Sequence, residues 1–166
     1  MGLRHSPHWK EKQEAMKTAK PLDAITLALQ PGTVAREGFL GSDSRSLADI
    51  LAADQAAVER LHLSHPQIAR RMKELRDAGQ KGLGDWIVIP PQWEARVDAV
   101  RGHLPCPFGD PGLYSKTLIA VRNTRLGMEI VYSDLLIHLI EEHGFYEGRG
   151  SPFRLDPERI AAALGL

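Results

Sequence analysis

The side chains best suited to chemistry lie around a single cysteine and in the stretch from residue 128 to 154. Cys106 is the one cysteine of the 166-residue chain, and it follows His103 by three positions. His138 and His143 are five positions apart. Thiolate sulfur and imidazole nitrogen are the usual zinc ligands of structural sites, and two closely spaced pairs commonly build such a site. We therefore predict a zinc site formed by Cys106, His138 and His143, with His103 as the fourth ligand.

The same residues have two other interpretations. In the first, Cys106 is a small buried apolar side chain, His138 packs in the core, and His143 is a cation at the negative end of a helix dipole. In the second, Cys106 is a nucleophile with His138 or His143 as its base, because a neighbouring imidazole favours the thiolate. No catalytic motif surrounds the cysteine. The catalytic assignment among these three residues therefore stays open.

The two histidines are expected on a short helix that follows a strand. Residues 128–132 alternate with a strand period, Ser133 can cap a helix, and Gly144 can end it in a left-handed conformation. Residues five apart point roughly 140° apart around an ideal helix, so the pair can chelate only if the last turn loosens. A strand pair, a two-histidine helix and an upstream cysteine resemble a ββα zinc finger. The resemblance covers only these elements, and the usual second cysteine is missing.

A glycine-rich loop follows this helix and carries candidate ligands for an anion. Arg149, Ser151 and Arg154 lie in it, and guanidinium and hydroxyl groups bind anionic ligands or cofactors. Phe145 and Tyr146 are interpreted as core residues. The loop is thus a candidate cofactor-binding segment, separate from the predicted zinc ligands.

The first half of the chain is predicted to be helical, with helices over residues 8–20, 23–29, 47–61 and 64–79. The last begins at a capping box and is expected to end at Gly79. A second histidine pair, His5 and His8, is interpreted as solvated. Basic residues share one face of the last helix: Arg70, Arg71, Lys73 and Arg76. Together with the preceding helix they suggest a helix-turn-helix, and nucleic-acid binding through residues 47–79 is kept as a third functional interpretation.

The second half is predicted to contain strands over residues 86–89, 93–99, 116–122 and 128–132, followed by a final helix capped by Asp156. The segment from 102 to 112, with three prolines around Cys106, is predicted to be an irregular loop. The fold class is therefore α+β: a helical N-terminal half, then a small antiparallel sheet with a packed C-terminal helix. We predict two parts, 1–82 and 83–166, the second with the Cys/His cluster, that form one cooperative unit because their join is short.

Composition narrows the function classes. The chain has 21 basic and 21 acidic residues, and this balance argues against a protein that coats nucleic acid or anionic membrane. Its 43% of hydrophobic residues allow a core. One cysteine excludes an intrachain disulfide framework, and no apolar run approaches the roughly 20 residues needed to cross a bilayer. We expect a small cytoplasmic, non-enzymatic binding module, stabilised by a Cys/His metal site, with a ligand or protein partner that is not identified. A Cys–His enzyme is the alternative.

Overall fold

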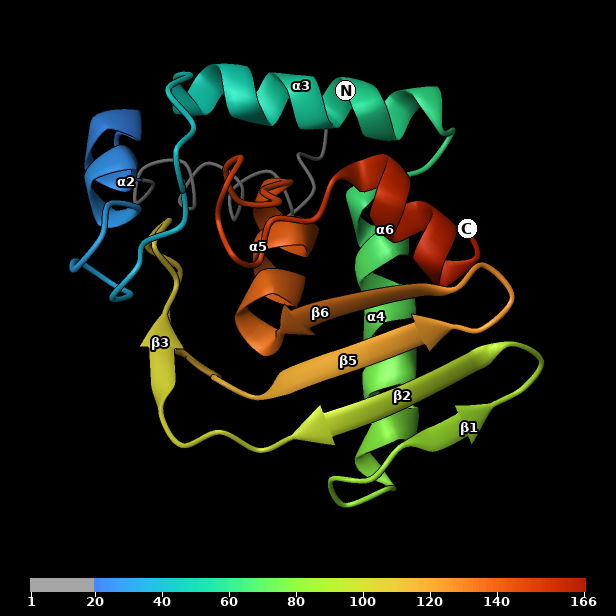
Figure 1. Cartoon of the computed structure of the whole chain (residues 1–166). Helices are drawn as coiled ribbons and strands as arrows, with labels where there is room; N and C mark the ends of the chain where they lie inside the picture. The colour runs from blue at the N-terminus through green and yellow to red at the C-terminus, as the bar shows by residue number, and fades with distance from the viewer. Residues whose placement is uncertain (1–19) are drawn as a thin grey trace, which may run out of the picture.

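The computed structural model describes residues 20–166. The helix predicted over residues 8–20, apart from its last residue, and the pair His5 and His8 lie outside the described residues. Every helix within the described range is too short or too polar to span a membrane. The described part has the predicted α+β class, with helices first, then strands, then a C-terminal helix (Figure 1).

The described part of the first half, from residue 20 on, contains three helices: α2 (Leu22–Ala28), α3 (Leu47–Arg60) and α4 (His65–Gln80). The capping box of α4 is confirmed, since the Ser64 hydroxyl accepts from the Gln67 N–H and the Gln67 side chain accepts from the Ser64 N–H at 2.8 Å. These bonds satisfy N–H groups that an uncapped helix would leave unpaired. The predicted boundaries of these three helices agree with the structure to within two residues.

The prediction that Gly79 ends α4 is wrong, because the helix continues to Gln80. Gly79 is instead a packing position between α4 and the sheet. A methyl group built on it would lie 3.0 Å from Ala95 Cβ and 3.1 Å from Val97 Cγ2. The missing side chain therefore lets the helix backbone approach the strand closely.

A four-stranded antiparallel sheet forms the centre of the second half. Its strand order is β1-β2-β5-β6, and its hairpin register pairs Ala95 with Val121 and Val121 with Ile130. These three residues are buried on one face of the sheet, as the alternating pattern predicts. The strand bounds are Ile87–Ile89, Trp93–Asp98, Leu118–Asn123 and Met128–Ser133.

A second, two-stranded sheet occupies the segment predicted to be an irregular loop. Strands β3 (His103–Pro105) and β4 (Leu113–Ser115) pair antiparallel, with Leu104 opposite Tyr114. Each strand has only three residues, which is too short for an alternating pattern to be visible beside prolines and glycines. Residues 106–112 connect these strands and carry Cys106 at their start.

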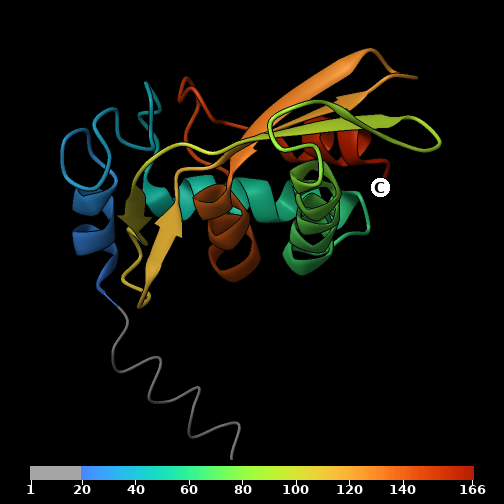
Figure 2. The same cartoon turned by 90° about the horizontal axis from the view of Figure 1, so that it is seen from below.

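Helix α5 (Asp134–His143) follows β6 directly, and α6 (Pro157–Leu164) closes the chain. Figure 2 shows α4 and α5 on the same side of the four-stranded sheet, with β3 and β4 beside α5. Asp156 occupies the N-cap position of α6, as predicted, but its side chain makes no capping hydrogen bond. Its carboxylate instead pairs with Arg154 at 2.9 Å.

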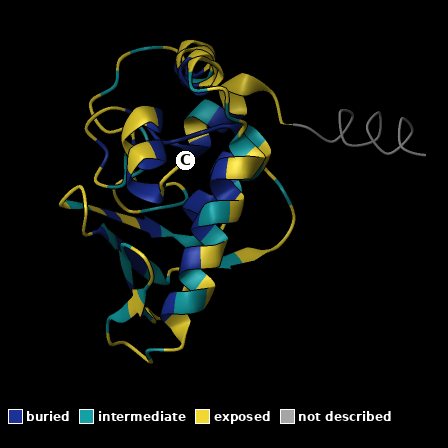
Figure 3. Ribbon diagram, turned by 90° about the vertical axis from the view of Figure 1, so that its right-hand side faces the viewer, coloured by how far each residue is buried: buried dark blue, intermediate teal, exposed yellow. Residues whose placement is uncertain are grey.

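The core of residues 20–166 consists of two apolar clusters that meet at α5. The larger cluster lies between α4, the sheet and α6, and the smaller one packs α2, α3 and residues 106–108 against α5. Figure 3 shows the corresponding alternation along the long vertical helix, α4, where buried and exposed residues succeed each other. Leu136 and Ile140 of α5 belong to the larger cluster and Leu135 and Leu139 to the smaller one. Helix α5 is therefore fixed by packing on both sides.

Candidate metal centre

Four potential metal ligands converge where the β3–β4 connection meets α5. Cys106 and Asp110 come from the connection, and His138 and His143 come from the helix. One ligand atom of each residue lies within 4.8 Å of those of the other three. Cys106 is buried, and the two imidazoles are 13% and 18% exposed. Asp110 is the most exposed of the four, at 36%, and it leaves the cluster accessible from one side.

The shortest distances between ligand atoms of the cluster run from the Asp110 carboxylate to the two imidazoles. Asp110 Oδ2 lies 2.9 Å from His138 Nε2 and 2.7 Å from His143 Nε2. Cys106 Sγ lies 3.6 Å from the same His143 nitrogen. One oxygen, two imidazole nitrogens and one sulfur thus surround a common point. A mixed donor set of this kind suits a divalent transition-metal ion, zinc among them.

Helix α5 presents both imidazoles to this point without unwinding. Ser133 accepts from the Leu136 N–H at its start, and Gly144 adopts the left-handed conformation after its last residue. The Gly144 N–H still donates to the Ile140 carbonyl at 3.0 Å, so the expected loosening of the last turn is not seen. The imidazole centroids of His138 and His143 are 5.5 Å apart, at 78° to each other. The reach of the side chains therefore compensates for the unfavourable spacing around the helix.

Aromatic side chains hold each imidazole in its orientation. Phe108 stacks on His143 with ring centroids 4.2 Å apart and 11° between the planes. Tyr114, on β4, stacks on His138 with the same centroid distance. Groups that fix the orientation of a ligand lower the entropy lost when a metal binds. The β3–β4 region thus supplies two ligands and two aromatic supports to the cluster.

Burial disfavours charge on the cysteine and on one histidine. It raises the pKa of the Cys106 thiol, an effect that the backbone N–H groups of Asp110, Phe108 and Gly109 oppose. Burial likewise lowers the pKa of His138, against the attraction of the Asp110 carboxylate. A metal ion needs a neutral imidazole, and its own charge favours the thiolate. The N–H groups around the sulfur would stabilise that thiolate.

His138 Nε2 is a buried nitrogen without a well-formed hydrogen bond to any described residue. It approaches Asp110 Oδ2 but not in hydrogen-bonding geometry, although the distance is only 2.9 Å. Buried polar atoms in folded proteins normally have a partner, and an exception points to a missing ion or water. The orientation of His138 is thus one that a bound cation would explain.

The arrangement does not have the geometry of a Cys–His–Asp catalytic triad. In a triad, the nucleophile and the acid bind opposite nitrogens of the imidazole. Here the Cys106 sulfur and the Asp110 carboxylate both face Nε2 of His143. Asp110 is therefore placed as one more electron-pair donor to a common point. It does not orient the His143 imidazole for proton transfer.

The predicted cluster and the cluster in the structure differ in their fourth residue. Cys106, His138 and His143 come together, whereas His103 lies on β3, pairs with Ser115 and is exposed outside the cluster. Asp110 takes the fourth place. The available signal was a carboxylate four residues after Cys106 in the same short segment, and carboxylate oxygen is an accepted zinc ligand.

The candidate anion-binding residues have internal roles. Both terminal nitrogens of Arg154 donate to the buried Asp54 carboxylate, at 2.6 and 2.8 Å. The Ser151 hydroxyl donates to Glu147 at 2.6 Å. Arg149 has an exposed side chain, and its backbone N–H donates to Asp43 at 3.0 Å. The structure does not bring these three side chains together around a vacant anion site.

The basic residues of α4 are also largely engaged within the protein. Arg76 pairs with Asp134 at 3.1 Å, and Lys73 pairs with Glu141. The Arg71 Nε–H donates to the Leu164 carbonyl at 3.2 Å. Side chains occupied in this way are less available for phosphate groups than free ones.

No family model, no curated protein and no solved structure matches this chain.

Proposed function

We propose that the chain is a non-enzymatic binding module whose second half is stabilised by one zinc ion held by Cys106, Asp110, His138 and His143. The observation that carries the proposal is the convergence of four donor atoms within 4.8 Å of one another. One buried thiol and three partly buried ionisable side chains do not gather in this way for packing alone, because desolvating polar groups is costly. A bound cation offsets that cost.

The donor set and its spacing fit zinc. Ligand atoms around a tetrahedral zinc, at bond lengths of roughly 2.0–2.3 Å, lie roughly 3.3–3.7 Å apart. The spacings here run from 2.7 Å between the Asp110 and His143 atoms to at most 4.8 Å, so small side-chain adjustments suffice. A thiolate and a carboxylate would also balance the two positive charges of the ion.

Four protein ligands favour a structural role over a catalytic one. Structural zinc sites are closed by four protein ligands, whereas catalytic sites keep one position for water or substrate. The ligands connect residues 106–110 to α5, two segments far apart in the sequence. Metal binding would therefore hold the β3–β4 region on the helix, and its binding energy would contribute to folding.

The other two interpretations have less support. The Cys–His enzyme requires a reactive thiolate, but burial raises the pKa of Cys106 and the geometry around His143 is not that of a triad. Nucleic-acid binding requires free basic side chains on α4, and most of them already have partners. We place the module in the cytoplasm because of its single cysteine.

The test is elemental analysis of protein purified without a histidine tag. We expect one zinc per chain in the wild type and almost none in Cys106→Ser. His103→Ala is the matched control: this histidine lies three residues before Cys106 but outside the cluster, so the variant should keep its zinc. Chelation should remove at least about 3 kcal/mol of stability, which corresponds to a Tm lower by about 10 °C.

Three results would contradict the proposal. They are wild-type protein without stoichiometric metal, a Tm that added zinc does not change, and a His103→Ala variant that loses metal as fully as Cys106→Ser. Rapid alkylation of Cys106 at neutral pH in the metal-free protein would instead favour the Cys–His enzyme, because only the thiolate reacts.

A further inference from the structure

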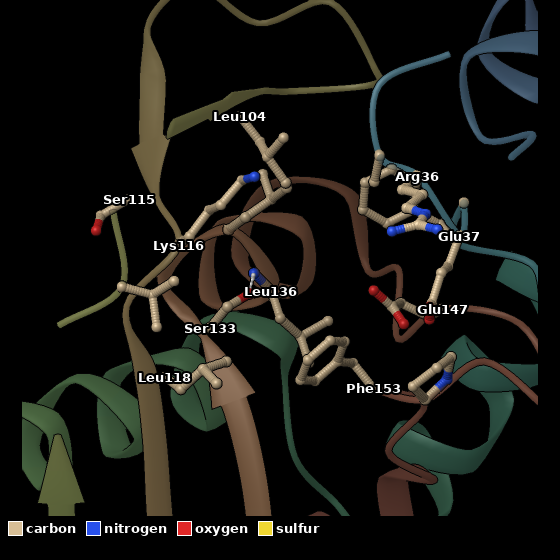
Figure 4. Close-up of a pocket in the computed structure, with 16 residues that line it drawn as sticks. Arg36, Glu37, Leu104, Ser115, Lys116, Leu118, Ser133, Leu136, Glu147 and Phe153 are labelled. Carbon is tan, nitrogen blue, oxygen red and sulfur yellow. Dashed lines mark hydrogen bonds between the residues drawn. The ribbon is translucent and has the colours of Figure 1, made fainter. Parts of the chain in front are cut away.

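A cavity of about 320 Å³ lies at the start of α5, and none of the four clustered residues lines it. Its walls come from the connection between α2 and α3, from the β3–β4 region, from the start of α5 and from residues 147–153 (Figure 4). Small-molecule sites start at about this volume and are mostly apolar. The apolar lining residues include Phe39, Leu104, Leu118, Leu136, Pro152 and Phe153.

One buried acid interrupts this apolar lining. Glu147 is only 5% exposed, and its carboxylate lies at the cavity beneath Arg36 and Glu37, across from Lys116 (Figure 4). The Ser151 hydroxyl donates to Oε2 at 2.6 Å. Among residues 20–166 no group donates to the other oxygen, Oε1. The carboxylate therefore has an unused acceptor atom beside an apolar space.

The backbone holds this carboxylate in place. Glu147 has a φ of 65°, a left-handed conformation that costs energy for a residue with a side chain. The next residue, Gly148, donates its N–H to the Phe39 carbonyl at 2.8 Å, and Arg154 donates to the Glu147 carbonyl at 2.8 Å. These bonds fix the backbone of residue 147, and the Ser151 hydroxyl holds its carboxylate at the cavity. Strained, rigid positions of this kind are typical of binding sites.

Among residues 20–166 no cation forms an ion pair with the Glu147 carboxylate, although Arg154 attracts it from nearby. Arg154 is close, but its guanidinium is taken up by Asp54 and Asp156. Burial raises the pKa of Glu147 to about 7, against the opposing effects of the Ser151 hydrogen bond and the Arg154 charge. A ligand that brought a positive charge and an N–H donor to Oε1 would satisfy the acid in a site of low polarity, where such a bond is strong.

We propose that this cavity binds a small primary amine with an apolar body, its ammonium group donating to Glu147 and its alkyl or aromatic part contacting Phe39, Leu136 and Phe153. The proposal does not require the zinc site to be correct. The alternative ligand is a carboxylate with an apolar body, whose charge Lys116 and Arg36 would bind. Both of these cations are exposed, so solvent and salt screen them, whereas the buried acid is screened little.

The test uses the full chain and 2-phenylethylamine as the probe, with binding followed by amide chemical shifts in ¹⁵N spectra. Two comparison compounds share its body: 2-phenylethanol is neutral, and 3-phenylpropanoate is an anion. We expect the amine to bind at least about 10-fold more tightly than either, since a charge-assisted bond to a buried acid is worth that factor or more. Shifts should centre on Phe39 and Phe153.

Two matched variants test the role of the acid. Glu147→Gln keeps the shape and the Ser151 contact but removes the charge, and it should weaken amine binding at least about 10-fold. Glu37→Gln makes the same change at an exposed acid of the same cavity, and it should leave the affinity within about 2-fold. The wild-type ranking of the three compounds remains a test even if Glu147→Gln folds poorly.

Several outcomes would overturn the proposal. They are tighter binding of 3-phenylpropanoate than of the amine, equal binding of amine and alcohol, amine affinity unchanged in Glu147→Gln, and no binding of the amine at millimolar concentration. The last would mean that Glu147 only fastens its own loop through Ser151.

Discussion

Replacing Glu147 by Gln should make the protein more stable at neutral and alkaline pH but not at pH 4. The pKa of this buried carboxyl is raised from 4.5 to about 7, with burial as the largest cause. Between these two values the folded state holds the proton more tightly than the unfolded state does. Stability therefore falls as pH rises through this window and is flat above it. At about 1.36 kcal/mol per pKa unit, the loss amounts to about 3 kcal/mol.

The assay is urea unfolding of wild type and Glu147→Gln from pH 4 to pH 8.5. The difference between their unfolding free energies isolates this group, because the other titrating groups are common to both proteins. We expect this difference to grow by about 3 kcal/mol in favour of the variant between pH 4.5 and 7.5. Glu37→Gln, at an exposed position, should follow the wild type throughout. A difference that did not change with pH would refute the reasoning and show that Glu147 reaches water in solution.

Three further predictions concern the fold. Arg154→Ala should cost about 3–5 kcal/mol in urea unfolding, because it leaves the buried Asp54 carboxylate without its two bonds of 2.6 and 2.8 Å. Gly79→Ala should lower the free energy of unfolding, since a methyl group 3.0 Å from Ala95 Cβ costs about 1–3 kcal/mol and the gain in helix propensity is only about 1 kcal/mol. The two halves should unfold in one transition by circular dichroism and by tryptophan fluorescence; release of a stable fragment ending near residue 82 in limited proteolysis would contradict this.

Local sequence signals predicted most of the fold. The ends of α5 are set by Ser133 and Gly144, whose capping and left-handed preferences act through neighbouring backbone atoms. Strand β6 follows from an alternating pattern with one buried face, whereas β5 buries three consecutive residues. The sequence was less informative about residues whose role depends on contacts with distant parts of the chain. Gly79 gives the same signal whether it ends a helix or lets a strand approach.

Three of the four clustered residues were predicted because sulfur and imidazole are recognisable ligand types. Asp110 was missed because aspartates are common, and its role depends on the path of residues 106–112 between two short strands. The Glu147 site could not be predicted either. A glutamate in a polar, glycine-rich loop is expected to be exposed, and only the packing of residues 38–42 against 148–151 buries it.

The proposed zinc site and the proposed amine cavity are built from the same structural elements, so a metal ion at the first would affect ligand binding at the second. Helix α5 directs His138 towards the metal ligands and Leu136 towards the cavity. The β3–β4 region does the same, since Tyr114 stacks on His138 while Leu104 lines the cavity. Residues 106–112 have few backbone bonds of their own, so a metal ion would fix the position of Leu104 relative to α5. A preformed wall lowers the entropy lost on binding a ligand. The zinc ion would thus contribute to affinity at the cavity although it does not contact the amine.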